Sequence, residues 1–170
     1  MPTGDVGIRP IRAGDTSELE RFYAGLSDES RRLRFFAVTR GLSAAQSAAF
    51  CSADHAHREG FVATIPDPRG RRDRIIGHLC LEPAGDGRAE VAIAVADEFQ
   101  RGGIGRRLTT AAIAWAQAAG VDTLTASMLT SNAGIHRLVA ALGLPSRLQP
   151  SGVDTSRVDI TVPAAPALAA

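Results

Sequence analysis

The chain has 170 residues, 45% of them hydrophobic, and its 19 basic and 18 acidic residues give a formal net charge of +1. That length is typical of one compact domain, and the balanced charge excludes the strongly basic face of a dedicated nucleic-acid-binding protein. No apolar run approaches the ~20 residues that span a bilayer, and the N-terminus lacks the regions of a signal peptide. We therefore expect a cytoplasmic protein without nucleic-acid or membrane partners, with one domain over residues 1–163 and a disordered tail over 164–170.

The potential metal and disulfide ligands are few and poorly spaced. Cys51 and Cys80 lack the CxxC spacing of a structural zinc site, and we expect both to be buried thiols. Asp54, His55 and His57 lie close together in the sequence, but a further ligand is missing, so we predict a polar helix end and no metal site. Every basic residue is arginine, so the chain contains no lysine that could itself be acylated.

The N-terminal part is predicted to form a strand followed by three helices. Residues 6–12 alternate apolar and basic side chains, and a proline within them favours an edge strand. The capping-box spacing of Asp15 and Glu18 predicts the start of a helix with an apolar stripe. Further helices are predicted from Ser27 and from Ser43. The apolar stripe consists of Leu19, Phe22, Tyr23 and Leu26.

Beyond the third helix the hydrophobic period changes from about 3.6 to 2, which indicates strands. Residues 61–65, 74–82 and 88–96 are predicted to form an antiparallel meander, the last two strands being joined by a Gly-Asp-Gly turn. We expect His78 and Cys80 to face opposite sides of their strand, which would exclude an adjacent thiolate–imidazole pair.

The C-terminal part is predicted to contain two helices and two strands. A long helix follows a glycine-rich loop and ends at Gly120. Because a helical crossover leads into it, the strand over residues 123–128 is expected to run parallel to the strand over 88–96. A shorter helix over residues 132–142 and a final strand over 156–162 complete a mixed α/β arrangement. The long helix is predicted to face inward with Ile104, Leu108, Ala111, Ala112, Trp115 and Ala119.

The loop Gln100–Gly105 joins the third meander strand to the long helix. Successive backbone N–H groups at a helix N-terminus, made accessible by glycines, can bind a phosphate or pyrophosphate. Arg101, Arg106 and Arg107 add positive charge there. The loop is neither GxxxxGK[ST] nor a complete GxGxxG, and it follows a meander, which disfavours ATP and dinucleotide ligands.

The motif Gln100-x-x-Gly103-x-Gly105, after the strand that begins at Glu90, resembles the pyrophosphate-binding motif of the GNAT superfamily of acyl-CoA N-acyltransferases. The resemblance covers roughly residues 7–144. It implies a mixed central sheet flanked by helices, in which two parallel strands splay around acetyl-CoA. It also implies that pyrophosphate is held by Gln100, Arg101, Gly102, Gly103, Ile104, Gly105 and Arg106, and the pantetheine arm by Ile93, Ala94, Val95 and Asn132.

A narrower resemblance lies at the N-terminus. Ile8–Arg12 and Gly25–Phe36 are similar to the acyltransferase module of bacterial Pat-type protein lysine acetyltransferases. This resemblance implies a protein lysine as acceptor, with an acyl-CoA synthetase as the candidate protein. Those enzymes often carry the module fused to a synthetase-like or cyclic-nucleotide-binding domain. The order Arg101-Gly102 is reversed in many relatives, a departure that would weaken CoA binding.

Glu90 is the predicted general base. A lysine amine, with a pKa of about 10.4, is protonated at neutral pH and cannot attack a thioester until a base removes its proton. Alternation along the strand places Glu90 on a face of alanines that leaves room beside the carboxylate. The resemblance supports the same residue, because Glu90 matches the glutamate that acts as base in protein-acetylating members. The competing interpretation is a solvated glutamate paired with Arg88.

After the amine attacks the thioester, the reaction needs a hydrogen-bond donor for the oxyanion of the tetrahedral intermediate and a proton for the CoA thiolate that leaves. The resemblance makes the backbone N–H of Val95 the donor. Many relatives use a tyrosine as acid, but the matching position is Val139, so a tyrosine acid is excluded there. His136 and water are the alternatives.

Two other functions remain open from the sequence. Acetylation of a small amine or an antibiotic would need an enclosed acidic acceptor pocket, whereas a protein acceptor needs an open groove. A non-catalytic acyl-CoA sensor would bind acetyl-CoA without transferring its acyl group. Two arginine clusters are expected to be solvated surface or, if functional, to bind an acidic protein face or the 3′-phosphate of CoA. These clusters are Arg31, Arg32 and Arg34, and Arg69, Arg71, Arg72 and Arg74.

Overall fold

The structure, a computed structural model, describes residues 6–67, 69 and 72–164. They form a seven-stranded sheet with the order β1-β2-β3-β4-β5-β7-β6. The strands are β1 (Gly7–Pro10), β2 (Glu59–Ile65), β3 (Arg74–Pro83), β4 (Arg88–Val95), β5 (Thr123–Leu129), β6 (Ser146–Pro150) and β7 (Thr155–Thr161). The helices are α1 (Thr16–Ala24), α2 (Asp28–Phe35), α3 (Ala44–Cys51), α4 (Ile104–Ala118) and α5 (Ala133–Leu142), with short 3-10 turns η1 (Ala13–Asp15) and η2 (Asp97–Phe99).

The strand pairing confirms the predicted meander and the predicted parallel pair. Strands β2, β3 and β4 are antiparallel neighbours, and β4 pairs with β5 in parallel after the α4 crossover. Strand β1 lies at the edge, as its proline favours. Strand β6 was not predicted: Ser146–Pro150 is short, largely exposed and preceded by Pro145, so it lacks a buried alternating face. Its pairing with β7 therefore creates an edge that the sequence pattern does not reveal.

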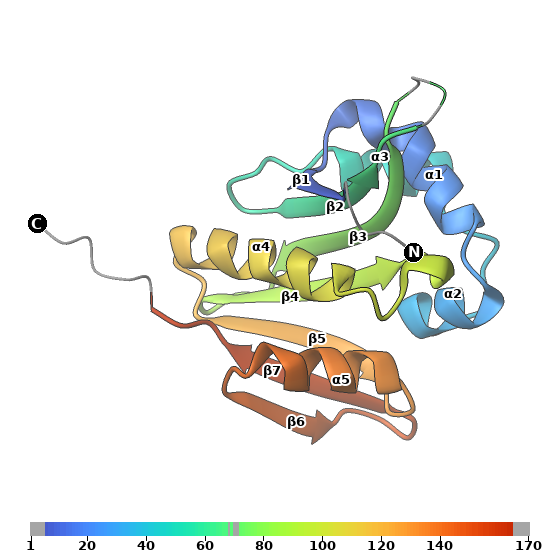
Figure 1. The fold of residues 1–170 in the computed structure, drawn as a ribbon. Coiled ribbons are helices and arrows are strands. Elements are labelled where there is room, and N and C mark those ends of the chain that lie inside the picture. Colours follow the sequence, from blue (N-terminus) through green and yellow to red (C-terminus); the bar gives the residue numbers. More distant parts are fainter. Residues whose placement is uncertain (1–5, 68, 70–71, 165–170) are drawn as a thin grey trace, which may run out of the picture.

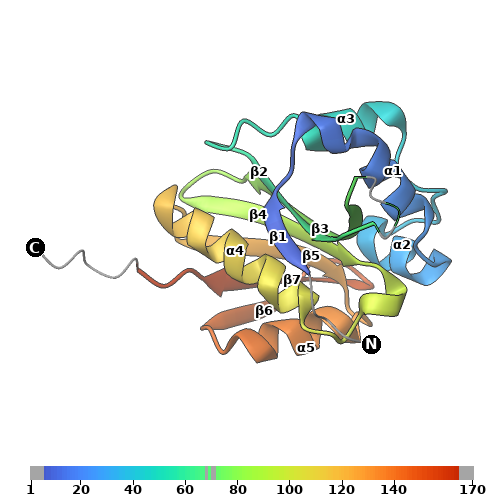
Figure 2. The same cartoon turned by 45° about the horizontal axis from the view of Figure 1, so that its top comes forward.

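The helices pack in two layers on opposite faces of the sheet (Figure 1). Helices α4 and α5 cover one face over a core that includes Leu79, Leu108 and Leu124. On the other face α1 and α3 pack over a second core that includes Tyr23 and Val62. Figure 2 shows α1, α2 and α3 grouped on one side of the molecule, away from β6, and α2 contacts β4 and β5. No helix in the described part of the chain is long and apolar enough to cross a membrane.

All four residues of the predicted stripe are buried; Leu19, Phe22 and Tyr23 lie on α1, and Leu26 follows the end of the helix. The predicted capping box is wrong: Asp15 precedes the helix, but its side chain makes no cap hydrogen bond there. Instead its carboxylate accepts hydrogen bonds from Arg9 at 2.7 and 2.8 Å and from the Arg12 N–H at 2.8 Å. A guanidinium from β1 offers two charge-assisted hydrogen bonds, which outcompete a single neutral amide.

Replacing Asp15 with asparagine is expected to lower the free energy of unfolding at pH 7 by about 1–3 kcal/mol. Burial raises the pKa of Asp15, but the hydrogen bonds from Arg9 and Arg12 outweigh it, so the pKa lies below its usual value. A lowered pKa stabilises the fold above the unfolded-state pKa of about 3.9, and this contribution disappears as the pH falls through the folded-state pKa. Urea unfolding of both proteins from pH 7 to pH 3 should show the difference shrinking; a constant difference would contradict the assignment.

Helix α4 begins at the predicted loop and ends as predicted, with Gly120 beyond its C-cap at φ +71°. The inward face differs at one position. Ala119 is exposed and Ala116 is fully buried, since the buried positions repeat every four residues from Ile104. Residues 165–170, most of the predicted tail, lie outside the described residues.

Candidate functional site

The central feature of the site is the point where β4 and β5 separate. Their parallel pairing begins at Arg88 opposite Thr123 and ends at Glu90 opposite Thr125. Beyond it the two strands diverge towards their C-terminal ends (Figure 1). On the other side of β4, the pairing with β3 continues to Val95. One edge of β4 therefore lacks a strand partner over its second half.

The hydrogen-bond direction shows which main-chain groups face this gap. The N–H of Ala96 donates to the carbonyl of Ile76 at 2.9 Å, so Ala96 is directed towards β3. Along a strand, the main-chain N–H and C=O groups of successive residues point alternately to one neighbouring strand and to the other. The main-chain groups of Ile93 and Val95 therefore point into the gap, whereas those of Ala94 point towards β3. The Ala94 side chain packs with the core beneath α1 and α3.

A cavity of about 50 Å³ occupies the gap. It extends from α5 on one face of the sheet to α2 on the other. Its lining is mainly apolar, and Arg34 is the one charged residue within it. The strand and helix residues that line it include Val91, Ala92, Ile93, Ala126, Met128, Leu138 and Val139.

The predicted glycine loop opens beside this cleft. Gly103 is the N-cap of α4 at φ +82°, and the first helical hydrogen bond runs from the Arg107 N–H to its carbonyl at 3.1 Å. The N–H groups of Ile104, Gly105 and Arg106 precede that bond and have no intrahelical acceptor. A Cβ atom on Gly105 would lie 3.8 Å from Ile93, which places this helix start against the cleft lining.

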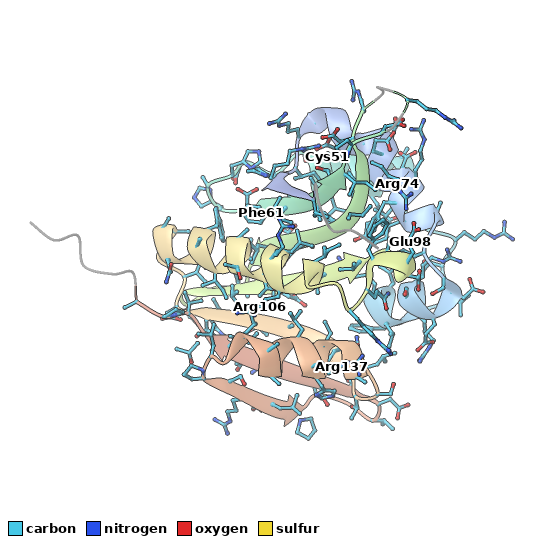
Figure 3. The ribbon with its side chains drawn as sticks, in the orientation of Figure 1. Cys51, Phe61, Arg74, Glu98, Arg106 and Arg137 are labelled. Atoms are coloured by element: carbon cyan, nitrogen blue, oxygen red, sulfur yellow. The ribbon has the colours of Figure 1, made fainter. Side chains whose placement is uncertain are left out.

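Charge near the helix start is less concentrated than the sequence indicates. Arg101 and Arg106 are exposed, and neither has an ion-pair partner among the described residues. Arg107 donates to the carbonyl of Val6 at 2.7 Å and so supports the N-terminal segment. Arg106 on α4 and Arg137 on α5 lie on neighbouring helices (Figure 3).

Gln100 and Asp97 tie the loop to α2. The Gln100 amide donates to the hydroxyl of Ser30 at 3.0 Å and to the carbonyl of Val95 at 3.1 Å. Asp97 accepts from the Ser27 N–H at 2.9 Å and from the hydroxyls of Ser27 and Ser30. Sequence reasoning missed Asp97, because its partners are distant in the chain. Gln100 thus fixes the loop and the strand end in this structure rather than offering its amide to a ligand.

Glu90 lies on β4 where the pairing with β5 ends, and its side chain is exposed. The alternative pairing with Arg88 is absent, because Arg88 binds Asp159 at 2.7 Å. Among the described residues Glu90 has neither a hydrogen-bond partner nor an ion-pair partner for its carboxylate. Its cross-strand neighbour Glu82 is engaged by Arg58 through two hydrogen bonds of 2.6 and 2.7 Å. Glu90 therefore has a free carboxylate where the β4–β5 pairing ends, one residue before Val91, which lines the cleft.

The residues that follow β5 have local roles as well. Asn132 is buried and lines the cleft, and its side-chain oxygen caps α5 by accepting from the Ile135 N–H at 3.2 Å. Val139 also lines the cleft, so an apolar group occupies the position of the tyrosine found in many relatives. The ring Nε2 of His136 lies 3.1 Å from the Thr130 carbonyl, which holds this imidazole against its own loop.

The structure corrects the expectations for His78, Cys80 and Arg34. Residues two apart on a strand share a face, and His78 and Cys80 are both buried beneath α1–α3. Arg34 is not solvated surface, because its guanidinium contacts the Cys80 sulfur at 3.4 Å. Cys51 and Cys80 are free buried thiols, as predicted.

The other arginines of the two clusters are paired or exposed. Arg31 pairs with Asp28, Arg32 with Glu29 and Arg74 with Glu98. Figure 3 shows the last pair between β3 and η2. Arg72 donates to the Gly14 carbonyl and Arg69 is exposed, whereas Arg71 lies outside the described residues.

The predicted polar helix end is a small hydrogen-bonded loop. The Asp54 carboxylate accepts the N–H groups of Ala56, His57 and Arg58 at 2.8–3.0 Å, and these bonds hold its pKa well below the usual value. His55 pairs instead with Glu59. Within residues 6–67, 69 and 72–164, no group of three or more His, Cys, Asp or Glu side chains could hold a metal ion.

Comparison with known proteins agrees with this geometry. The chain is 30% identical over 172 residues to acetyltransferase Pat of Mycolicibacterium smegmatis, covering 95% of this chain and 49% of that protein. It therefore spans about half the length of that curated relative. The crystal structure of the GNAT domain of S. lividans PAT superposes with a TM-score of 0.80 at 28% identity, covering 91% of this chain and 89% of that one.

A second solved structure shares the fold at lower identity. The GNAT superfamily phosphinothricin acetyltransferase of Sinorhizobium meliloti, solved with AcCoA, has a TM-score of 0.73 at 20% identity and covers 92% of this chain and 88% of that one. The family described as Acetyltransferase (GNAT) matches residues 19–144, which include β4, the glycine loop and the whole of α5. With its splayed central strands and the open helix start beside them, this chain belongs to the GNAT acetyltransferase family.

Proposed function

We propose that this chain transfers an acetyl group from acetyl-CoA to the ε-amine of a protein lysine, by direct transfer in a ternary complex. The observation that supports this most directly is the position of Glu90. Its carboxylate is exposed and unpaired at the residue where the β4–β5 pairing ends and the cleft begins. A general base must be near the acyl donor and free to accept a proton, and Glu90 meets both requirements.

The donor would be bound mainly by main-chain groups. The free N–H groups at the start of α4, those of Ile104, Gly105 and Arg106, suit the pyrophosphate of CoA, and the exposed side chains of Arg101 and Arg106 would add charge. The pantetheine arm would pair with the main chain of Ile93, as an extra strand pairs with a free edge. At Val95 only the N–H is free to face the donor, because the carbonyl accepts from Gln100. The amide nitrogen of Asn132 is free to contact that arm, since capping uses only its oxygen.

The chemistry follows from these positions. Glu90 takes a proton from the lysine ammonium group, directly or through a water, and the neutral amine attacks the thioester carbonyl. The N–H of Val95 donates to the oxyanion of the tetrahedral intermediate. As the intermediate collapses, the C–S bond breaks, the amide nitrogen releases its remaining extra proton to water, and the CoA thiolate takes a proton from water. A protein acid is unsupported at this step, since Val139 is apolar and His136 is held by Thr130.

The surroundings of Glu90 favour a protein acceptor over a polycationic small molecule. The cleft lining contains no carboxylate side chain, so an enclosed acidic pocket is missing there. On the sheet face of Glu90, the neighbouring strands carry a polar network in which Asp159 accepts hydrogen bonds from Arg88 and Thr125. A lysine on a protein surface can approach over such a face. The similarity to Pat makes an acyl-CoA synthetase the proposed partner.

The experiment is acetylation of a whole-cell lysate with purified protein and isotope-labelled acetyl-CoA, followed by mapping of the labelled lysines. Because the chain contains no lysine, every labelled lysine comes from an acceptor. We expect a small set of lysines, including one on an acyl-CoA synthetase, that is unlabelled with the Glu90→Gln variant. Acetyl-CoA binding without any labelling would instead indicate a non-catalytic acyl-CoA sensor. Labelling of free amines alone would indicate a small-molecule acetyltransferase.

A further inference from the structure

Arg34 is a charged residue in an otherwise uncharged cleft. It projects from α2 and is the one charged side chain among the residues that line the cavity between β4 and β5. Its guanidinium lies over the ring of Phe35 at 5.0 Å and contacts the sulfur of Cys80 at 3.4 Å. Its Nε atom is buried and has no hydrogen-bond partner among the described residues. A strong donor therefore remains unused inside the cleft.

The side chains around Arg34 do not neutralise its charge. Burial raises the pKa of the Cys80 thiol and raises the pKa of Tyr23 to about 12. Burial and the neighbouring guanidinium lower the pKa of His78 to about 3. At pH 7 all three groups are accordingly neutral. Among the described residues no carboxylate forms an ion pair with Arg34, and Glu82, two residues beyond Cys80, is held by Arg58.

An uncompensated charge in an apolar cavity is costly, and proteins usually pair it. The other arginines of α2 follow this rule, since Arg31 and Arg32 pair with acids on the same helix. Arg34 instead faces the space where the two reactants must meet. The missing counter-charge is thus expected to arrive with a ligand, and the planar guanidinium suits a carboxylate.

We propose that Arg34 binds a carboxylate group carried by one of the two reactants in the transfer cleft. This rests on the acyl transfer from a CoA thioester proposed above, and a free amino acid that carries the carboxylate would replace the protein lysine as the acceptor. The carboxylate has two possible sources: the far end of a dicarboxylic acyl chain such as succinyl-CoA, or the acceptor, as in a free amino acid. In either case the carboxylate is unchanged in the reaction. The thioester C–S bond still breaks, the amide C–N bond still forms, and Glu90 still takes the amine proton.

The donor source is tested by calorimetry with succinyl-CoA and butyryl-CoA, whose acyl chains have similar length but differ in charge. The acceptor source is tested by initial rates with acetyl-CoA, comparing free amino acids with the corresponding amides. Both arms use the wild-type chain, Arg34→Met and Arg21→Met. Arg21 is a matched control, since it is exposed on α1, pairs with Glu18 and does not line the cleft.

In one of the two arms the wild-type chain should favour the carboxylate-bearing ligand by about tenfold or more, the usual scale of a charge-assisted hydrogen bond. Arg34→Met should abolish this preference and Arg21→Met should keep it. Without ligand, Arg34→Met should not lower the melting temperature, because it removes an unpaired charge. A purely structural arginine would instead lower it. If Arg34→Met does not fold, Arg34→Lys serves in its place. Lysine keeps the positive charge but lacks the planar guanidinium with its parallel N–H donors, so this variant should weaken the preference for the carboxylate-bearing ligand.

The results separate this inference from the proposed function. Tight acetyl-CoA binding without a carboxylate preference in either arm would overturn the role of Arg34 alone. A preference that persists in Arg34→Met would overturn it as well. Absence of binding to every CoA thioester would overturn the proposed function first.

Discussion

Replacing Glu90 with glutamine is expected to lower the rate of acetyl transfer by about 10²–10⁴-fold, the range that general base catalysis contributes. The amide keeps the shape of the side chain but cannot accept the proton of an ammonium group. Acetyl-CoA affinity should change by less than about twofold, because the donor is proposed to bind through main-chain groups at the other end of the cleft. Free thiol release and calorimetry measure the two quantities separately.

A matched control is Glu82→Gln. Glu82 lies opposite Glu90 on β3, but its carboxylate is already bound by Arg58 at 2.6 and 2.7 Å. We expect this variant to retain its rate within about threefold, since both carboxylate oxygens of Glu82 already accept hydrogen bonds from Arg58. A large loss of rate in Glu82→Gln with little change in Glu90→Gln would transfer the role of base to Glu82.

Replacing Gly103 with valine is expected to weaken acetyl-CoA binding by about tenfold or more. Gly103 caps α4 at φ +82°, a conformation that a β-branched residue avoids. The loop would rearrange, and the N–H groups that follow it would no longer converge on one anion. Calorimetry with acetyl-CoA and with CoA should show equal losses, because both ligands carry the pyrophosphate.

The control for this variant lies at the other end of the same helix. Gly120 has φ +71°, and a Cβ atom there, as at Gly103, would meet nothing within 4 Å. Gly120→Val therefore introduces similar backbone strain far from the glycine loop. Thermal unfolding should show comparable destabilisation of the two variants, with acetyl-CoA affinity lost in Gly103→Val alone. Equal affinity losses would mean that global stability, and not the loop, controls binding.

Much of the fold could be predicted from local patterns. The stripe on α1, the start of α3 at Ser43 and the end of α4 before Gly120 depend on residues within a few positions of one another. The parallel pairing of β4 and β5 followed from the helical crossover between them. The glycine loop was also identified from the sequence, because the residues of its motif are contiguous in the chain.

Contacts between distant segments were not predictable in this way. The expected cap at Asp15 was replaced by Arg9 from β1, and Asp97 was overlooked because it binds Ser27 and Ser30 of another segment. Arg34 belongs to an arginine-rich stretch of polar helix, and only packing against β3 turns it towards the cleft.

By itself the sequence determined the order of most elements, the glycine loop at a helix start and a glutamate on the preceding strand, because each depends on short-range spacing. The tertiary structure decided which of these groups are free to act. It engaged Gln100 and Glu82, left the carboxylate of Glu90 unpaired and placed the half-buried Arg34 at the cleft without a counter-charge. The physical reason is that pairing and burial are set by side chains that the folded sheet brings together from distant parts of the chain.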